Sequence, residues 1–252
     1  MGEGNLPEMR LTKSFLAVAG CLLLALLLPA ARPLPASAAE PVIVWGGPPG
    51  VRQVALTFDD GPSPRATRKI LALLNQYGAH ATFFVLGDHL EEYPGLVRAE
   101  IRDGEEVGNH SFDHPRFPKC DMPAQERELE RTQVDLDLLG YHPADLLFRP
   151  PFGDYNQRLV AYLGHTHRRL VLWGIDSGDW QGLPAEAIVH NVLDRVRDGA
   201  IIIFHDSDEH ERANRTPTVE ALKVILPALQ AAGYRMVTIS ELIAGAPSGK
   251  RP

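Results

Sequence analysis

The chain has few cysteines and no excess of positive charge, and both features limit what it can be. Only Cys21 and Cys120 occur in 252 residues, and Cys21 falls in a segment that we expect to be removed. With one cysteine left, no disulfide can form within the chain, so the core itself must stabilise the fold. The net charge of -7 includes no basic block, which argues against a nucleic-acid partner, and nothing indicates a partner protein.

Long apolar runs are also rare, and the main one lies near the N-terminus. Basic residues precede the apolar run 15–28, and the small-residue stretch "ASAAE" follows it, an order typical of a secretory signal. Because the run is shorter than the roughly 20 residues of a membrane-spanning helix, we predict that residues 1–39 are a cleaved signal peptide. The protein would then be secreted or lie at the cell surface. An uncleaved anchor is the alternative, and "VAGC", ending at Cys21, looks like a lipoprotein cleavage box.

Beyond the signal, apolar runs rich in β-formers alternate with helical patterns, which favours an α/β fold. The alternation implies right-handed crossovers and a parallel sheet, and runs such as "AIIIF" indicate strands covered on both faces. A closed or nearly closed (β/α) barrel and an open doubly wound sheet both fit this pattern. We expect the main domain at 54–243, with a lead-in at 40–53 and a flexible tail at 244–252. Strands are predicted at 53–58, 80–87, 105–111, 145–150, 169–176, 200–206 and 234–240, and helices at 66–78, 94–104, 123–140, 156–164, 184–199 and 216–233, the last interrupted by Pro227.

Polar residues follow several of the predicted strands at the point where each strand ends. Asp59 and Asp60 follow the first strand, and the stretches "NHSFDH", "RPPFGDYN", "DSGDW" and "HD" follow the third to the sixth. In either parallel fold, ligands bind at the carboxyl ends of the strands. Residues far apart in the sequence are therefore expected to meet on one rim.

Two carboxylates and two histidines in this group predict a metal site. Asp59 and Asp60 repel each other unless a cation lies nearby. His110 and His114 are four residues apart, a spacing that puts two imidazoles on one face of a helical turn. Such a pair alone is more often a solvated helix face, but a carboxylate on the same rim favours a metal. Two histidines and one aspartate would bind it, and the other carboxylate would be free to accept a proton.

The remaining rim residues suggest supporting roles. Arg149, at the start of "RPPFG", could hold an aspartate, expected to be Asp59, ionised and oriented, or form a purely structural ion pair. His205 ends an apolar strand, where a histidine is by default a core residue, but an acidic neighbour on the rim favours a general acid. Asp179 could orient that histidine. Trp180 could line a sugar groove or pack in the core.

The stretches "TFDDGP", "HSFDH", "RPPFGDYN", "DSGDW" and "IIIFHD" resemble, in this order, the five motifs of the polysaccharide deacetylases. This family is the NodB-homology domain of carbohydrate esterase family 4, and the resemblance spans residues 54–243. It implies a distorted (β/α) barrel with about seven parallel strands. It also implies removal of N-acetyl groups from polymers of N-acetylglucosamine, such as peptidoglycan or chitin-like oligomers, or of O-acetyl groups from xylan.

The resemblance also assigns roles to individual residues and implies a divalent metal ion. Zinc is expected, and a site of two histidines and one aspartate also suits cobalt or nickel. Ile203 stands where the family usually has leucine, a change of shape rather than of size. The expected catalytic residues are Asp59 as base, His205 as general acid, Arg149 and Asp179; the substrate-binding residues are Tyr155 through its backbone N–H, Trp180 and Ile203; and the metal ligands are Asp60, His110 and His114.

Two other classes of protein could use a similar set of residues. A glycoside hydrolase also carries paired carboxylates on a barrel, but it has no need for two histidines beside them. A non-catalytic glycan-binding barrel could lose the base or the acid, whereas every candidate position here is filled. A metal-dependent deacetylase acting on a polysaccharide is therefore the favoured hypothesis.

Overall fold

Nine parallel strands form a single sheet in a computed structural model, which describes Met1 and residues 43–245 of the chain. The predicted signal segment and most of the predicted tail lie outside the described residues. The strand order is β1-β6-β5-β4-β3-β2-β8-β7, and β9 also pairs with β2. The strands are β1 (Ile43–Val44), β2 (Gln53–Asp59), β3 (Ala81–Val85), β4 (Glu106–Asn109), β5 (Leu146–Phe148), β6 (Arg168–Val171), β7 (Ile175–Asp176), β8 (Ala200–His205) and β9 (Arg235–Met236).

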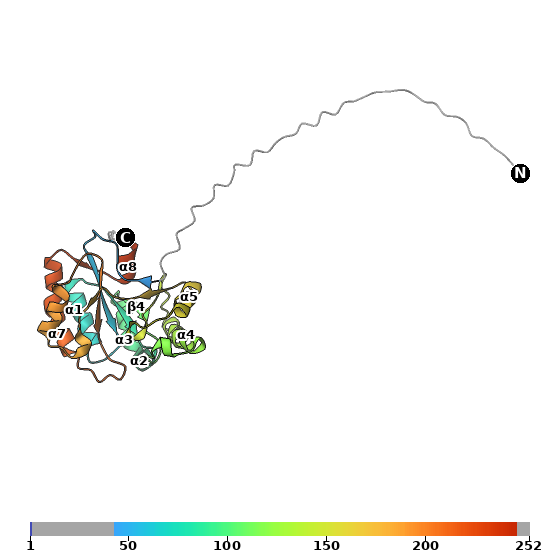
Figure 1. The fold of residues 1–252 in the computed structure, drawn as a ribbon, viewed down its shortest axis with the longest axis horizontal. Coiled ribbons are helices and arrows are strands. Elements are labelled where there is room, and N and C mark those ends of the chain that lie inside the picture. The colour runs from blue at the N-terminus through green and yellow to red at the C-terminus, as the bar shows by residue number, and fades with distance from the viewer. Residues whose placement is uncertain (2–42, 246–252) are drawn as a thin grey trace, which may run out of the picture. The chain divides into compact units, whose positions relative to one another are not determined.

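Helices connect the strands and cover the outer face of the sheet. Figure 1 shows α1 and α7 on one side of the sheet and α4 and α5 on the other. Within residues 43–245, no helix combines the length and the apolar composition needed to cross a membrane. The helices are α1 (Thr67–Tyr77), α2 (Gly87–Glu92), α3 (Pro94–Arg102), α4 (Met122–Leu138), α5 (Gln157–His165), α6 (Ala185–Leu193), α7 (Thr216–Ala231) and α8 (Ile239–Ala244).

One chain segment brings the two ends of the sheet together. The strands β6 and β7 lie near opposite ends of the strand order, yet only residues 172–174 separate them in sequence. Within this segment, Leu172 N donates to Val44 O on β1 and Gly174 N donates to Ile201 O on β8. The sheet therefore curls into a distorted barrel, which settles the choice that the alternating pattern left open.

The strand β2 separates two apolar cores because successive side chains point to opposite faces. Its residues of even number, from Val54 to Phe58, pack with α1 and α7 in the larger, outer core. Ala55 belongs to a smaller core inside the barrel, which Ile239 and Leu242 of α8 also join. Asp59 is on the same face of β2 as Ala55, so the polar site lies next to this inner core.

Most predicted elements form, and the differences have local causes. The predicted strand 169–176 is split into β6 and β7, and β1 adds a short strand within the predicted lead-in. The last strand ends at Met236 because the Thr238 hydroxyl and the Glu241 carboxylate form a capping box that begins α8. Helix α6 ends at Leu193, well before the predicted end at 199, and α2 was not predicted.

Helix α7 continues through Pro227, contrary to the predicted interruption. A proline inside a helix removes one backbone hydrogen bond and costs about 3 kcal/mol. Burial of an almost continuous apolar face offsets this cost, because Leu222, Leu226 and Leu229 are each almost completely shielded from solvent. Tertiary packing thus overrides the local signal.

The stacked phenylalanines of the outer core provide a test of the packing. Phe83 is buried, and its ring centroid lies 5.0 Å from that of Phe58. We expect Phe83→Ala to lower the free energy of unfolding by about 3–5 kcal/mol, because the protein cannot fill the cavity left behind. Leu138→Ala, at a position 77% exposed, should change it by less than about 0.5 kcal/mol. Urea unfolding measures both, and similar losses would contradict this account of the core.

Candidate functional site

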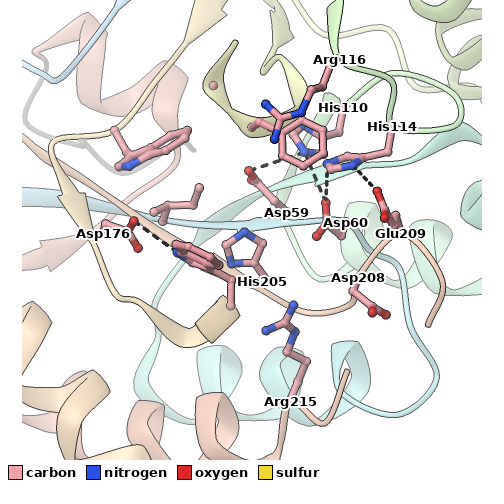
Figure 2. A pocket seen from close by; sticks show the side chains of 15 residues that line it. Asp59, Asp60, His110, His114, Arg116, Asp176, His205, Asp208, Glu209 and Arg215 are labelled. Atoms are coloured by element: carbon pink, nitrogen blue, oxygen red, sulfur yellow. Dashed lines mark hydrogen bonds and ion pairs between the residues drawn. The ribbon is translucent and has the colours of Figure 1, made fainter. Parts of the chain in front are cut away.

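A cavity of about 540 Å³ opens where the strands β2, β4, β7 and β8 end. Its lining includes most of the residues predicted for the site, and Figure 2 shows their side chains converging on it. The rim expected from the sequence is therefore present. The predicted residues in its lining are Asp59, Asp60, His110, His114, Trp180, Ile203 and His205.

Asp60, His110 and His114 form a group that could hold a metal ion. Asp60 Oδ1 lies 3.4 Å from His110 Nε2 and 3.3 Å from His114 Nε2, and the ligand atoms all lie within 4.8 Å of one another. Asp60 Oδ1 is buried and has no hydrogen-bond partner among the described residues. A cation among these atoms would satisfy that oxygen and the imidazole lone pairs. The donor set therefore fits a divalent transition metal.

A loop, and not the expected helical turn, brings the two histidines together. The loop follows β4, and both Ser111 and His114 have left-handed backbone conformations, with φ of 76° and 63°. His114 N donates to Ser111 Oγ at 3.2 Å, which helps to hold the turn. The imidazole centroids of His110 and His114 are 5.2 Å apart. The two histidines are close together, as predicted, but a loop and not a helical turn brings them there.

The outer nitrogen of each imidazole has its own acceptor. His110 Nδ1 donates to Arg149 O at 2.7 Å, and His114 Nδ1 lies 2.9 Å from Glu209 Oε2. These partners favour protonation at Nδ1 and leave Nε2 of each ring free to bind a cation. Burial and the neighbouring His110 lower the pKa of His114, which favours its neutral, metal-binding form. Burial raises the pKa of Asp60, but the nearby histidines outweigh it and lower the pKa overall.

Asp59 is held by a fully buried arginine. Arg149 Nη1 donates to Asp59 Oδ1 at 2.7 Å and to Thr57 Oγ1 at 2.8 Å. The guanidinium has no solvent exposure and lies over the Phe84 ring, 4.2 Å from its centroid. Arg149 Nε also donates to Val171 O at 3.3 Å. These contacts leave the carboxylate of Asp59 little freedom to rotate, and Asp59 is the aspartate that Arg149 was expected to contact.

His205 lies beside Asp59 on the neighbouring strand and is held from behind by Asp179. In the pairing of β2 with β8, Asp59 is the partner of His205, so both side chains point to the same face. Asp179 Oδ1 lies 2.8 Å from His205 Nδ1, and its Oδ2 accepts from Thr218 Oγ1 at 2.9 Å. Burial lowers the pKa of His205, but Asp179 and, more weakly, Asp60 outweigh it and raise the pKa to about 9.

The walls of the cavity contain two of the predicted substrate-binding residues. Trp180 is 56% exposed and donates from Nε1 to Asp176 Oδ2 at 3.3 Å, so its ring is not packed in the core. Ile203 precedes His205 by two residues on β8 and faces the same cavity. Tyr155 is not part of the lining, since its side chain packs half-buried against a separate apolar cluster. The role predicted for its backbone N–H stays a prediction.

Sequence reasoning missed several residues that surround the candidate metal-binding group of Asp60, His110 and His114. The Phe152 ring lies 4.6 Å from that of His114, and the Arg116 guanidinium lies 3.9 Å from the Phe152 centroid. Phe152 has a left-handed backbone, with φ of 61°, and is half exposed. The signal for Phe152 was its place in "RPPFG". Nothing local in the sequence distinguished Arg116 or Glu209, because only the fold brings them to the site.

Comparisons with known proteins agree with this geometry. A family model described as "Polysaccharide deacetylase" matches residues 46–170. A peptidoglycan-N-acetylglucosamine deacetylase of Bacillus cereus is 36% identical over 203 residues, which are 80% of this chain and 92% of the relative. The chain belongs to the polysaccharide deacetylase family. The resemblance of the five motifs and the expectation of a hydrolase are thereby confirmed.

Other members of the family extend the comparison. A chitooligosaccharide deacetylase of Azorhizobium caulinodans is 33% identical over 190 residues, 73% of this chain and 90% of the relative. The crystal structure of the Bc1960 peptidoglycan N-acetylglucosamine deacetylase is similar with a TM-score of 0.76 and 32% identity, covering 81% of this chain and 94% of that one. Some polysaccharide deacetylases are longer, and the chain spans 39% of the peptidoglycan deacetylases of Listeria monocytogenes and Bacillus subtilis that it matches.

The contact between His205 and Asp179 predicts a measurable pKa change. In Asp179→Asn, the charge that outweighs burial is lost, so the pKa of His205 should fall from about 9 toward the ordinary value of about 6.5. NMR titration of the imidazole measures it. Asp176→Asn is the matched control, because Asp176 contacts Trp180 and not His205. A His205 pKa that stays near 9 in Asp179→Asn would disprove the proposed origin of the shift.

Proposed function

We propose that this polysaccharide deacetylase is a metal-dependent enzyme that hydrolyses N-acetyl groups of polysaccharides containing N-acetylglucosamine. One observation carries the proposal. Asp59, oriented by Arg149, and His205, held by Asp179, occupy paired positions on β2 and β8 beside a group that can hold a metal. A base and an acid next to an electrophilic cation are the components that amide hydrolysis needs.

Asp60, His110 and His114 would hold the ion. Zinc is the expected metal, and cobalt or nickel also suits these donors. When bound, the cation would polarise the acetyl carbonyl and lower the pKa of the attacking water. The partners at Nδ1 of each histidine support this role, because they orient the rings toward Asp60.

Asp59 would act as the general base. Arg149 Nη1 donates to one oxygen of the Asp59 carboxylate and also to Thr57 Oγ1, so the guanidinium is held in place and fixes the carboxylate at the cavity. The second oxygen, Oδ2, lies 3.8 Å from His110 Nε2 and hence close to the metal-binding group. Asp59 would take one proton from water as the water oxygen attacks the acetyl carbon. We expect the bound cation and the backbone N–H of Tyr155 to stabilise the negative charge that would develop on the carbonyl oxygen.

His205 would act as the general acid. A pKa of about 9 keeps its imidazole protonated near neutral pH, with Asp179 accepting from Nδ1. The Nε2 proton is then available to the glucosamine nitrogen as the carbon–nitrogen bond breaks. The products are acetate and a free amine on the sugar, and the proton taken by Asp59 balances the one that His205 donates.

The cavity and the relatives support a glycan as the substrate. The exposed indole of Trp180 offers an apolar face on which a pyranose ring can stack, and Ile203 adds an apolar side chain to the lining, where we expect the acetyl group. Relatives at 33–36% identity are named for peptidoglycan and chitooligosaccharide. A substrate of this kind agrees with the predicted signal peptide and with a location outside the cell or at its surface.

The catalytic assignment predicts that activity depends on both the metal and Asp59. With N-acetylglucosamine oligomers, the wild-type protein loaded with zinc should release acetate, and a chelator should abolish the release. Asp59→Asn should lower kcat by about 10² to 10⁴-fold, the usual contribution of a general base. Asp103→Asn, which removes a surface carboxylate paired with Arg102, should leave kcat unchanged. Acetate release that survives both metal stripping and Asp59→Asn would refute the assignment.

A panel of substrates separates N-deacetylation from the O-acetyl esterase activity of the same family. Muropeptide, chitin oligomers and acetylated xylan are offered to the same preparation, and acetate and free amine are measured together. We expect acetate and amine in equal amounts from the N-acetylated substrates. Acetate from xylan alone, without new amine, would assign the esterase activity. New reducing ends without acetate would instead indicate a glycoside hydrolase.

A further inference from the structure

The loop between β8 and α7 places a carboxylate against one of the metal-binding histidines. Glu209 Oε2 lies 2.9 Å from His114 Nδ1, the nitrogen that points away from the metal-binding group. Figure 2 shows the imidazole of His114 between Asp60 on one side and Glu209 on the other. His114 and Glu209 are 95 positions apart in the sequence, so only the fold brings them into contact.

The two histidines of the group are held in different ways. His110 Nδ1 donates to Arg149 O, a backbone carbonyl directly after β5, so the backbone fixes that ring. His114 lies in a loop with a left-handed backbone, and its Nδ1 has a side chain as its acceptor. The Phe152 ring, 4.6 Å away, restricts His114 on a further side but offers no hydrogen-bond acceptor. The orientation of His114 therefore depends on the Glu209 side chain, whereas the orientation of His110 depends on a backbone carbonyl.

A carboxylate on the outer nitrogen of a metal-binding histidine has known effects. It keeps the proton at Nδ1, so the lone pair at Nε2 faces the metal, and it makes Nε2 a stronger donor. Such outer partners typically change metal affinity by about 10 to 100-fold. By contrast, Glu209 is 42% exposed, and a partly exposed ion pair contributes little to folding. Its effect should therefore appear in metal binding and not in the stability of the metal-free protein.

The loop itself is held by contacts that do not involve Glu209. Asp208 Oδ1 accepts from Arg212 N at 2.5 Å and from Ala213 N at 3.1 Å. The buried Arg215 donates from Nε to Ser207 O at 2.8 Å. Replacing the Glu209 side chain should therefore leave the loop in place, which makes the contact with His114 accessible to mutation.

We propose that Glu209 is a positioning residue that orients His114 for metal binding. It links the cavity wall formed by the loop 207–215 to the metal-binding group. The inference rests on the proposed function only in that Asp60, His110 and His114 hold a metal, and it does not depend on which polysaccharide is the substrate.

Metal affinity without substrate tests the inference. Zinc affinity is measured on the full chain at fixed pH by competition with a chromogenic chelator, for wild type, Glu209→Gln and Glu209→Ala. Glutamine keeps the size and an oxygen acceptor but removes the charge, so we expect about tenfold weaker binding, with a larger loss for alanine. Glu211→Gln is the matched control, since it removes a carboxylate of the same loop whose hydrogen-bond partner is Tyr93 and not His114.

Thermal unfolding of the metal-free variants distinguishes positioning from a purely structural role. We expect metal-free Glu209→Gln and Glu209→Ala to unfold at the wild-type temperature, with a smaller upward shift when zinc is added. The inference would be overturned if Glu209→Ala bound zinc within twofold of wild type, or if Glu211→Gln lost as much zinc affinity as the Glu209 variants. It would also be overturned if zinc binding weakened only in variants whose metal-free form is less stable than wild type. If wild type releases acetate while Glu209 has no effect on zinc, only the inference fails. If zinc binding depends on Glu209 but no acetate appears, only the proposed function fails.

Discussion

The buried ion pair between Arg149 and Asp59 is the constraint on which the mouth of the barrel depends. Taking two charges out of water costs several kcal/mol each, and this cost is offset only where hydrogen bonds satisfy the remaining polar atoms. Arg149 meets this condition by donating to Thr57 and to the backbone of Val171 and Leu172 as well as to Asp59. The pair thereby ties the ends of β2, β5 and β6 together and fixes Asp59 at the cavity.

The other reactive groups follow the same plan, in which a second residue holds each one from behind. Asp179 contacts His205, the carbonyl of Arg149 accepts from His110, and Glu209 contacts His114. Asp179 lies in a buried turn and the Arg149 carbonyl lies directly after β5, whereas Glu209 comes from a partly exposed loop. The groups proposed for proton transfer are thus held by buried contacts, whereas one of the proposed metal ligands is held by a partly exposed side chain.

Much of the fold could be predicted from local patterns. The alternation of apolar runs with amphipathic segments predicts a parallel α/β sheet, because both periods are direct consequences of helix and strand geometry. The same reasoning failed where tertiary contacts outweigh local preference. Helix α7 runs through Pro227 because its apolar face is buried, and the run 169–176 divides into two strands because each half pairs at a different end of the sheet. A local pattern contains no information about such distant partners.

By itself, the sequence determined which reactive side chains exist and that they follow strand ends, because apolar runs, turn residues and motif spacing are local properties. It also determined membership of the family through five ordered motifs. Only the tertiary structure decided that the sheet closes into a distorted barrel and that the histidines converge through a loop. It alone brought Glu209 to His114, across 95 positions of sequence. Contacts at such separations arise when strands pair and pack, and that pairing depends on the whole chain at once.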